Sequence, residues 1–284
     1  MKFRAVIGSF VPPLHRGVGR GLLGWGLLLG SAGAVRATTA EQEGWQDLAG
    51  YLFHDAHEVF TREPAEGDRL RALGAAASLL NDPPVTSGKV ERAEAQLRQL
   101  VKDNGTDEPA IYARYLIARI AHLHRSAEVP EIEADYWAVI TAAPKHPLAQ
   151  LAAGKLALVL LYQRPDLSVA QRLSAAGELA PLAGNAQLPE TACAYYRVLA
   201  EAAMYYDVLD ERVLGWLQQA DTMGSRDIMT AMSLRVQLAE VARALGHRDE
   251  AIAYYRQYLA VAGPTDNRYR TAKDRMMELE KAAR

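Results

Sequence analysis

The residues best spaced for metal chemistry are His54, His57 and Glu58. They lie at positions i, i+3 and i+4 of a predicted helix, which places all three on one helical face. Imidazole and carboxylate groups are ligands that Zn²⁺ accepts. The spacing differs from the His-Glu-x-x-His pattern of zinc hydrolases, and no fourth ligand is evident elsewhere in the chain. An ordinary solvated helix face explains the same spacing. We therefore predict no metal centre, with the zinc site as the open alternative.

The other reactive side chains stand alone. His122 and His124 are two residues apart, so on a helix they point to different sides. Cys193 is the only cysteine, which excludes an internal disulfide, and its small neighbours favour a buried thiol. The chain after residue 37 contains no Gly-x-Ser-x-Gly, Walker or dinucleotide-binding motif, and its carboxylates are scattered. We therefore predict no catalytic residue and no cofactor.

The elements that must position these residues are helices that recur about every forty residues. A small or apolar anchor position is expected at the start of the second helix of each pair. Stepping along the chain gives these anchors: Ala93, Ile132, Ala170, Arg212 and Ala251. Four residues after each anchor stand Leu97, Tyr136, Ser174, Trp216 and Tyr255, of which four are large and apolar. The i to i+4 step keeps both positions on one helical face, and strand patterns are nearly absent. The predicted fold class is all-α.

Residues 234–264 contain the clearest unit: one helix up to a glycine, a tight turn, and a second helix. This unit resembles the tetratricopeptide repeat, although Arg235 and Ala239 replace the family's Trp and Gly, and the spacing exceeds the usual value of about 34. The resemblance implies an α-solenoid of about five antiparallel helix pairs with capping helices at both ends. An irregular helical bundle with accidental spacing is the alternative. The positions that carry the resemblance are Gly246, Ala251, Tyr255 and Pro264.

Residues 1–37 have the pattern of a secretory signal peptide. A basic segment precedes the apolar run at 21–35, and Val35-Arg36-Ala37 offers small residues at the −3 and −1 sites. We expect cleavage near Ala37, a periplasmic or secreted protein, and a tetratricopeptide-like domain over 38–284. A retained membrane anchor is the alternative. It is disfavoured because the run is rich in glycine and shorter than the about 20 residues that span a bilayer. We predict no stable membrane span after cleavage.

Cleavage would change the charge of the protein. The first 37 residues hold five Lys or Arg and no acid, so 27 basic and 34 acidic residues remain, a net charge of −7. Proteins that bind nucleic acid through its phosphates usually carry a basic surface. We therefore expect no nucleic-acid partner.

The resemblance also implies a partner-binding groove, lined by the first helix of each pair. Carrying over the family's inward positions gives four basic and two aromatic residues. They are Arg114, Lys155, Tyr162, Arg197, Tyr205 and Arg243. Arginine and lysine suit the carboxylates of an acidic peptide, and tyrosine supplies contact area at low entropic cost. The alternative is that these side chains are solvated or pair with Glu201 and Glu240.

These expectations predict an exported scaffold or adaptor without enzymatic activity, binding proteins or peptides in the bacterial cell envelope. The alternative is an envelope enzyme that acts on the cell wall, or an accessory subunit of an enzyme, built on a helical superhelix. Such an enzyme would need an acid pair clustered in a cleft.

Overall fold

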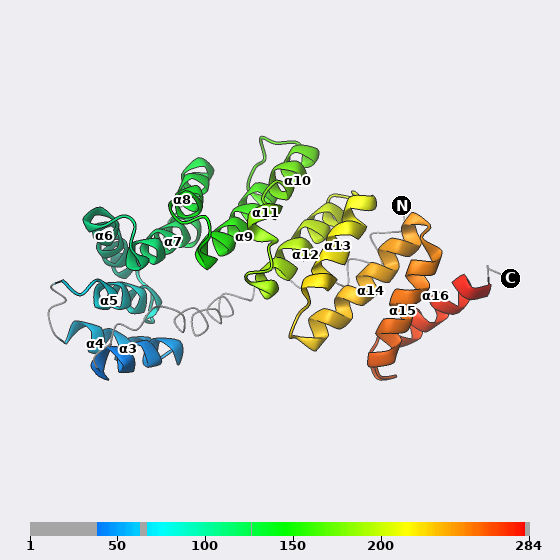
Figure 1. The fold of residues 1–284 in the computed structure, drawn as a ribbon, viewed down its shortest axis with the longest axis horizontal. Coiled ribbons are helices and arrows are strands. Elements are labelled where there is room, and N and C mark those ends of the chain that lie inside the picture. The colour runs from blue at the N-terminus through cyan, green and yellow to red at the C-terminus, as the bar shows by residue number, and fades with distance from the viewer. Residues whose placement is uncertain (1–38, 63–66, 126, 282–284) are drawn as a thin grey trace. The chain divides into compact units, whose positions relative to one another are not determined.

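A computed structural model describes residues 39–62, 67–125 and 127–281 (Figure 1). These residues form fourteen α-helices and contain no strand, which confirms the all-α fold class. The helices pack in consecutive pairs, as a solenoid-like arrangement requires. The predicted signal peptide at 1–37 lies outside the described residues. Of the described helices, none is both long enough and apolar enough to cross a lipid bilayer.

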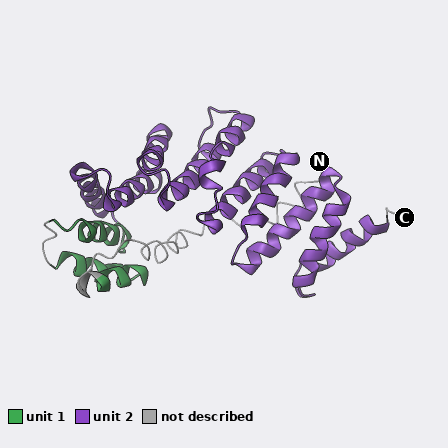
Figure 2. Cartoon of the chain, in the orientation of Figure 1, with its two compact units in different colours: residues 1–85 green, residues 86–284 purple. Residues whose placement is uncertain are grey.

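The chain divides into two compact units, Met1–Val85 and Thr86–Arg284 (Figure 2). We call them unit 1 and unit 2. The described helices of unit 1 are α3 (Thr39–Ala49), α4 (Phe53–Thr61) and α5 (Arg69–Asn81). The first five helices of unit 2 are α6 (Ser87–Asp103), α7 (Glu108–Leu123), α8 (Val129–Ala142), α9 (Pro147–Tyr162) and α10 (Val169–Gly177). The remaining six are α11 (Ala180–Ala183), α12 (Pro189–Tyr205), α13 (Glu211–Met223), α14 (Ile228–Leu245), α15 (Arg248–Val261) and α16 (Tyr269–Lys281).

The core of unit 1 is built around Phe60 of α4, whose side chain is almost wholly buried. The Trp45 ring packs edge-on against it, with ring centroids 5.1 Å apart. Gly74 of α5 lets the ring approach the backbone, because a Cβ there would lie only 2.6 Å from Phe60 Cζ. The ring is therefore held between α3 and α5, which also contact each other.

One helix boundary in unit 1 differs from the prediction. The apolar pattern predicts a single helix from Trp45 to Thr61, but the structure breaks it into α3 and α4. At the break, Tyr51 adopts a φ of 64°, in the left-handed region that non-glycine residues seldom occupy. The turn that follows lets α4 fold back onto α3. Burial of the Phe60 side chain between helices thus outweighs the local helical tendency.

In unit 2 the helix ends are set by local side-chain chemistry. The caps Thr86, Asp107, Ser168, Asp210 and Asp227 each accept a hydrogen bond from a backbone N–H of the first turn. Gly246 ends α14 in the left-handed conformation, with φ of 87°, so the chain reverses directly into α15. Consecutive helices contact each other along the unit, with the pairs α12–α13 and α14–α15 in especially close contact.

The predicted repeat frame holds in three of the five helices that carry an anchor. Ala93, Ile132 and Ala251 are buried, and so are the residues four positions later, Leu97, Tyr136 and Tyr255. In α10 and α13 the frame is wrong by one position. Ala170, Ser174 and Arg212 are exposed, Trp216 is half-buried, and the buried residues are instead Leu173, Val213 and Leu217. One residue turns a helix by about 100°, so a slip of one position carries the anchor off the packed face.

Candidate partner-binding surface

The six predicted groove residues all lie in unit 2, on the first helices of successive pairs. Arg114 is on α7, Lys155 and Tyr162 on α9, Arg197 and Tyr205 on α12, and Arg243 on α14. Their surroundings in the structure differ. Tyr162 and Tyr205 lie together, and Arg197 and Arg243 are paired with carboxylates. Among the residues that the structure describes, no carboxylate pairs with Arg114 or Lys155.

The two predicted tyrosines meet where α9 and α12 end. The ring centroids of Tyr162 and Tyr205 are 6.4 Å apart, with the planes at 68°. Tyr206, which the sequence reasoning did not select, lies 5.1 Å from the Tyr205 ring and 6.4 Å from the Tyr162 ring. The Tyr206 hydroxyl donates a 2.7 Å hydrogen bond to the Leu161 carbonyl oxygen, which fixes it to α9. We call these three residues the tyrosine cluster.

The tyrosine cluster offers apolar area to solvent. Tyr205 is 67% exposed and Tyr162 is 41% exposed, whereas Tyr206 is half-buried beneath the Arg172 guanidinium, 5.8 Å from its ring centroid. Burial, followed by the charge of Glu201, raises the pKa of Tyr162 to about 12. The hydroxyl therefore stays neutral at physiological pH, and the ring can make both apolar and hydrogen-bonding contacts.

Arg197 and Arg243 are held in ion pairs. Arg197 Nη2 lies 3.0 Å from Glu201 Oε1, and Arg243 Nη2 lies 3.0 Å from Glu240 Oε2. These are the pairings named above as the alternative to a groove role. Glu240 also accepts a hydrogen bond from the Tyr255 hydroxyl, at 2.5 Å. The charge of each arginine is thus balanced within the protein.

Arg114 is half-buried and reaches toward the loop between α6 and α7. Its Nη2 would lie 3.1 Å from a Cβ placed on Gly105. It forms no ion pair with any residue in the described parts of the chain. It lies on α7, whereas the tyrosine cluster is formed by residues at the ends of α9 and α12.

A second group, which the sequence reasoning found only in part, gathers where α7, α8 and α9 meet. Arg119 and His122 of α7 stand three residues apart, on one helical face, and Lys155 comes from α9. His122 Nδ1 lies 2.8 Å from the Tyr136 hydroxyl of α8, and its Nε2 lies 3.2 Å from Nε2 of Gln163. We call Arg119, His122 and Lys155 the cationic cluster.

The members of the cationic cluster stand on contacting helices, α7 and α9, and they interact electrostatically. Burial and then the positive charges of Arg119 and Lys155 lower the pKa of His122 to about 4. Burial and then Arg119 lower the pKa of Lys155 as well. His122 is therefore neutral at physiological pH, and the positive charge of the cluster rests on Arg119 and Lys155.

Arg119 could have been found from the sequence by its spacing. Tyr115, Arg119 and His122 follow one another at i, i+4 and i+7, a single face of α7. The family frame selected Arg114 instead, about a quarter-turn away from Tyr115 on the helix. No local pattern, however, indicates whether a carboxylate from another helix lies near Arg119, since that depends on how the helices pack.

The three residues of the alternative zinc site, His54, His57 and Glu58, do not converge. His54 is exposed and lies 3.4 Å from Glu58 Oε1. The His57 ring turns toward α5, with Nδ1 3.1 Å from the Ala75 carbonyl oxygen and 3.2 Å from Ser78 Oγ. Across the described residues, no group of three His, Cys, Asp or Glu side chains is arranged to hold a metal ion. Cys193 is buried, and burial raises the pKa of its thiol.

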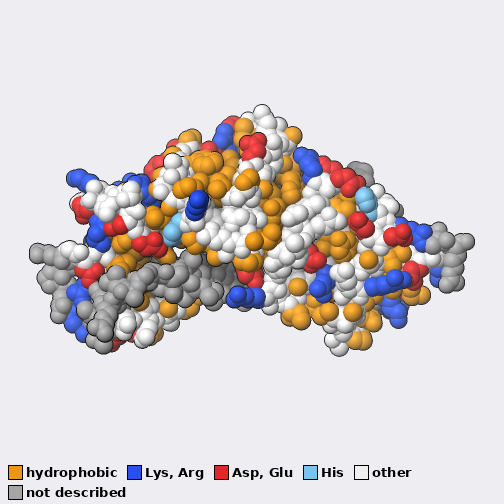
Figure 3. Space-filling view, in the orientation of Figure 1, with side chains coloured by type: hydrophobic (Ala, Val, Ile, Leu, Met, Phe, Trp, Pro, Cys, Tyr) orange, Lys and Arg blue, Asp and Glu red, His pale blue; other side chains and the backbone are white. Residues whose placement is uncertain are grey.

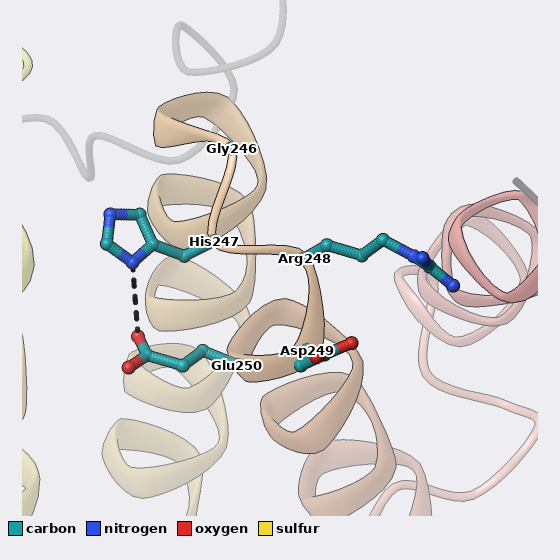
Figure 4. Close-up of a pocket in the computed structure, with 5 residues that line it drawn as sticks. All are labelled: Gly246, His247, Arg248, Asp249 and Glu250. Atoms are coloured by element: carbon teal, nitrogen blue, oxygen red, sulfur yellow. Dashed lines mark ion pairs between the residues drawn. The ribbon is translucent and has the colours of Figure 1, made fainter. Parts of the chain in front are cut away.

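A shallow depression at the turn between α14 and α15 is lined by residues 246–250 (Figure 4). His247 lies 4.0 Å from Glu250 Oε2, the pair marked in Figure 4, and 2.8 Å from Glu211 Oε1 of α13. The Arg248 side chain leads away from the turn, and its Nε donates to the Leu279 carbonyl oxygen of α16. These contacts tie neighbouring helices together, and the polar side chains do not converge on a common point.

Comparison with known proteins does not assign the chain to a family. No protein-family model matches it, and no curated protein sequence is similar enough to count as a relative. The face of unit 2 visible in Figure 3 carries basic and acidic side chains in mixture, with hydrophobic side chains gathered over its middle helices. The functional argument therefore depends on the tyrosine cluster and the cationic cluster.

Proposed function

We propose that this protein is a non-catalytic scaffold or adaptor of the bacterial cell envelope, which binds proteins or peptides along the first helices of unit 2. The observation that carries the proposal is the tyrosine cluster. Two of its rings are exposed, they come from neighbouring helix pairs, and Tyr206 is hydrogen-bonded to the α9 backbone beside them.

An exposed aromatic pair of this kind suits binding better than folding. The rings leave apolar area in water, which a partner would bury. Tyrosine has few rotatable bonds, so it loses little entropy when a partner docks, and it is enriched among residues that dominate interface energies. Successive helix pairs extend the same surface along the chain, as in repeat proteins that bind extended segments.

The export part of the proposal rests on the pattern of residues 1–37. Mass spectrometry of the mature N-terminus tests it in cells that express the full chain. We expect a protein that begins near Thr38, recovered from the periplasm or the medium. An intact N-terminus on cytoplasmic protein would contradict export while leaving the binding surface untouched.

The binding part is tested by a photo-crosslinking amino acid placed at position 205 in living cells. The matched control places it at Trp137, an aromatic residue of α8 that is 45% exposed. We expect discrete protein adducts from position 205 that are missing from position 137. No adducts from position 205, or the same adducts from both positions, would overturn the proposal.

Once an adduct partner is identified and purified, Tyr205→Ala should weaken its binding about 10- to 30-fold, the usual effect of removing a central aromatic anchor. Trp137→Ala should leave the affinity unchanged. Titration calorimetry of both variants measures the difference.

A further inference from the structure

Several half-buried arginines of unit 2 are balanced by a carboxylate. Arg164 pairs with Glu133 at 2.8 Å, Arg268 with Asp266 at 2.9 Å, and Arg275 with Glu240. Arg119 and Lys155 are among the half-buried cations without such a partner, because in the described parts of the chain no carboxylate lies within 4.0 Å of either one. They are distinguished by their position, since they stand on contacting helices, α7 and α9, and both act electrostatically on His122. The protein therefore places two half-buried positive charges near each other without a counter-charge.

Such an arrangement has an energetic cost. Each charge loses part of its hydration, and the two repel each other in a medium less polar than water. The C-terminal end of α7 offers partial negative charge to Arg119, which stands in the last turns of that helix. The same explanation fails for Lys155, which stands in the middle of α9. An anion bound from outside would relieve both costs.

The cationic cluster and the tyrosine cluster are linked by α9. Lys155 and Tyr162 are seven residues apart, so they lie on one face of the helix, about 10 Å apart along its axis. An extended peptide covers that distance in about three residues. The surface therefore fits a segment in which an acidic residue stands about three positions from an apolar one.

We propose that Arg119 and Lys155 form a carboxylate-binding site, which takes the acidic side chains of an extended partner segment whose apolar residue rests on the tyrosine cluster. This inference rests on the proposed function and adds the chemistry of the partner. Arginine and lysine both form strong, charge-assisted hydrogen bonds with carboxylates. His122, which is hydrogen-bonded to Tyr136, is neutral and adds no charge to the site.

The test uses a synthetic peptide with two glutamates, two glycine spacers and a phenylalanine, labelled for fluorescence anisotropy. Its control carries glutamine in place of glutamate. We expect the full-length mature protein to bind the glutamate peptide at least about 10-fold more tightly than the glutamine peptide. Arg119→Gln and Lys155→Gln should each remove about 10-fold of affinity for the glutamate peptide, whereas Lys273→Gln, at an exposed lysine of α16, should change nothing.

A second readout follows from the position of His122. The groups around it are Arg119, Lys155, the Tyr136 hydroxyl and the Gln163 amide. Burial is the larger cause of the low His122 pKa, and the charges of Arg119 and Lys155 lower it further. A carboxylate seated between the two cations offsets this second contribution. We therefore expect the NMR titration of His122 to move to higher pH when the glutamate peptide is bound, and to stay in place with the glutamine peptide.

The inference is overturned if the two peptides bind equally, if both glutamine variants retain full affinity, or if the His122 titration does not move. Circular dichroism shows whether each variant is folded. Lys155→Arg keeps the charge and should keep most of the binding, which separates loss of charge from loss of structure.

Adducts from position 205 without glutamate preference would reject the carboxylate site and retain the scaffold proposal. Glutamate-specific binding without those adducts would support the carboxylate site and reject the scaffold proposal.

Discussion

At the scale of single residues, unit 2 is stabilised by carboxylates that join several elements. Glu240 of α14 accepts hydrogen bonds from Tyr255 of α15 and Arg243 of its own helix, and it pairs with Arg275 of α16. Burial acts to raise the pKa of Glu240, but the bonds from these three partners outweigh it and hold the pKa below its usual value. The charged form of the carboxylate is therefore the one that the fold stabilises.

Asp266 and Arg268 show the same principle in the loop between α15 and α16. The carboxylate accepts two hydrogen bonds from the guanidinium, at 2.9 and 3.1 Å, and both side chains are only 12% exposed. Arg268 also donates to Ser233 Oγ of α14 at 2.9 Å and lies 5.6 Å from the centre of the Tyr258 ring. The pair thus fastens the loop to α14 and α15.

Asp266→Asn should lower the free energy of unfolding by about 2 kcal/mol at neutral pH, because the variant loses charge-assisted bonds in a largely buried pair. The Arg268 guanidinium holds the pKa of Asp266 well below its usual value of 3.8. The unfolded chain therefore takes up protons before the folded one, so the stabilisation is complete above about pH 5 and is lost as the pH falls through 3.8 and below. Urea denaturation at a series of pH values across this range measures the change in the free energy of unfolding.

The control is Asp210→Asn, since Asp210 and Arg212 repeat the same spacing on the surface. Their side chains are 41% and 55% exposed, so the variant should cost less than about 1 kcal/mol. An equal cost for both substitutions, or a cost for Asp266→Asn that persists at low pH, would show that the buried ion pair is not the cause.

At the scale of elements, the segment between α11 and α12 is organised by one buried residue. The Gln150 side chain of α9 is 2% exposed. Its amide nitrogen lies 2.8 to 3.2 Å from the carbonyl oxygens of Ala183, Asn185 and Leu188, which share its two N–H groups. Its oxygen accepts from the Leu188 N–H at 2.9 Å. This single side chain satisfies backbone groups that a helix-to-helix connection would otherwise bury without partners.

Gln150→Leu should destabilise the protein by about 2 to 4 kcal/mol, because leucine fills a similar volume but leaves these backbone groups unsatisfied. Hydrogen exchange measured by mass spectrometry should show the loss of amide protection first in peptides from α11 and the start of α12. Gln99→Leu, on the exposed face of α6, should leave exchange unchanged. Unaltered protection of the α11–α12 segment in Gln150→Leu would refute a structural role for these bonds.

At the scale of the whole molecule, the chain divides into two compact units, and the boundary along the chain falls between Val85 and Thr86. The boundary coincides with a local signal, since the Thr86 side chain accepts from the Lys89 N–H and so caps α6. Each unit has its own buried core, around Phe60 in unit 1 and along the consecutive pairs in unit 2. A unit with its own core is expected to fold by itself.

We therefore expect a protein made of residues 86–284 to keep the helical circular dichroism of its part of the chain and to unfold cooperatively with urea. The tyrosine cluster and the cationic cluster both lie in this unit, so the fragment should also bind the glutamate peptide with the affinity of the mature protein. A fragment 110–284 serves as the control, because it removes α6 and the start of α7 and exposes the apolar face they share. A non-cooperative transition for 86–284 would show that unit 2 is not autonomous.

The helical pattern predicted the fold well and the repeat frame less well. Ala251 and Tyr255 are both fully buried, as the repeat spacing predicts. In α10 and α13 the frame slipped because the spacing between units varies, and a slip of one residue exchanges a buried position for an exposed one. Leu173, Val213 and Leu217 are as apolar as the predicted anchors. A fixed spacing of about forty residues does not select them, because they stand one position away from it.

The sequence by itself determined the all-α class and the helix pair at residues 234–264, because these depend on residues within one or two helical turns. Only the tertiary structure decided which charges are balanced by residues of another helix. Arg164 meets Glu133 across 31 positions, and Arg275 meets Glu240 across 35. Such pairings depend on how separate helices pack, which no local spacing records. For the same reason the tyrosine cluster and the unbalanced charges of Arg119 and Lys155 became visible only once α7, α9 and α12 were placed together.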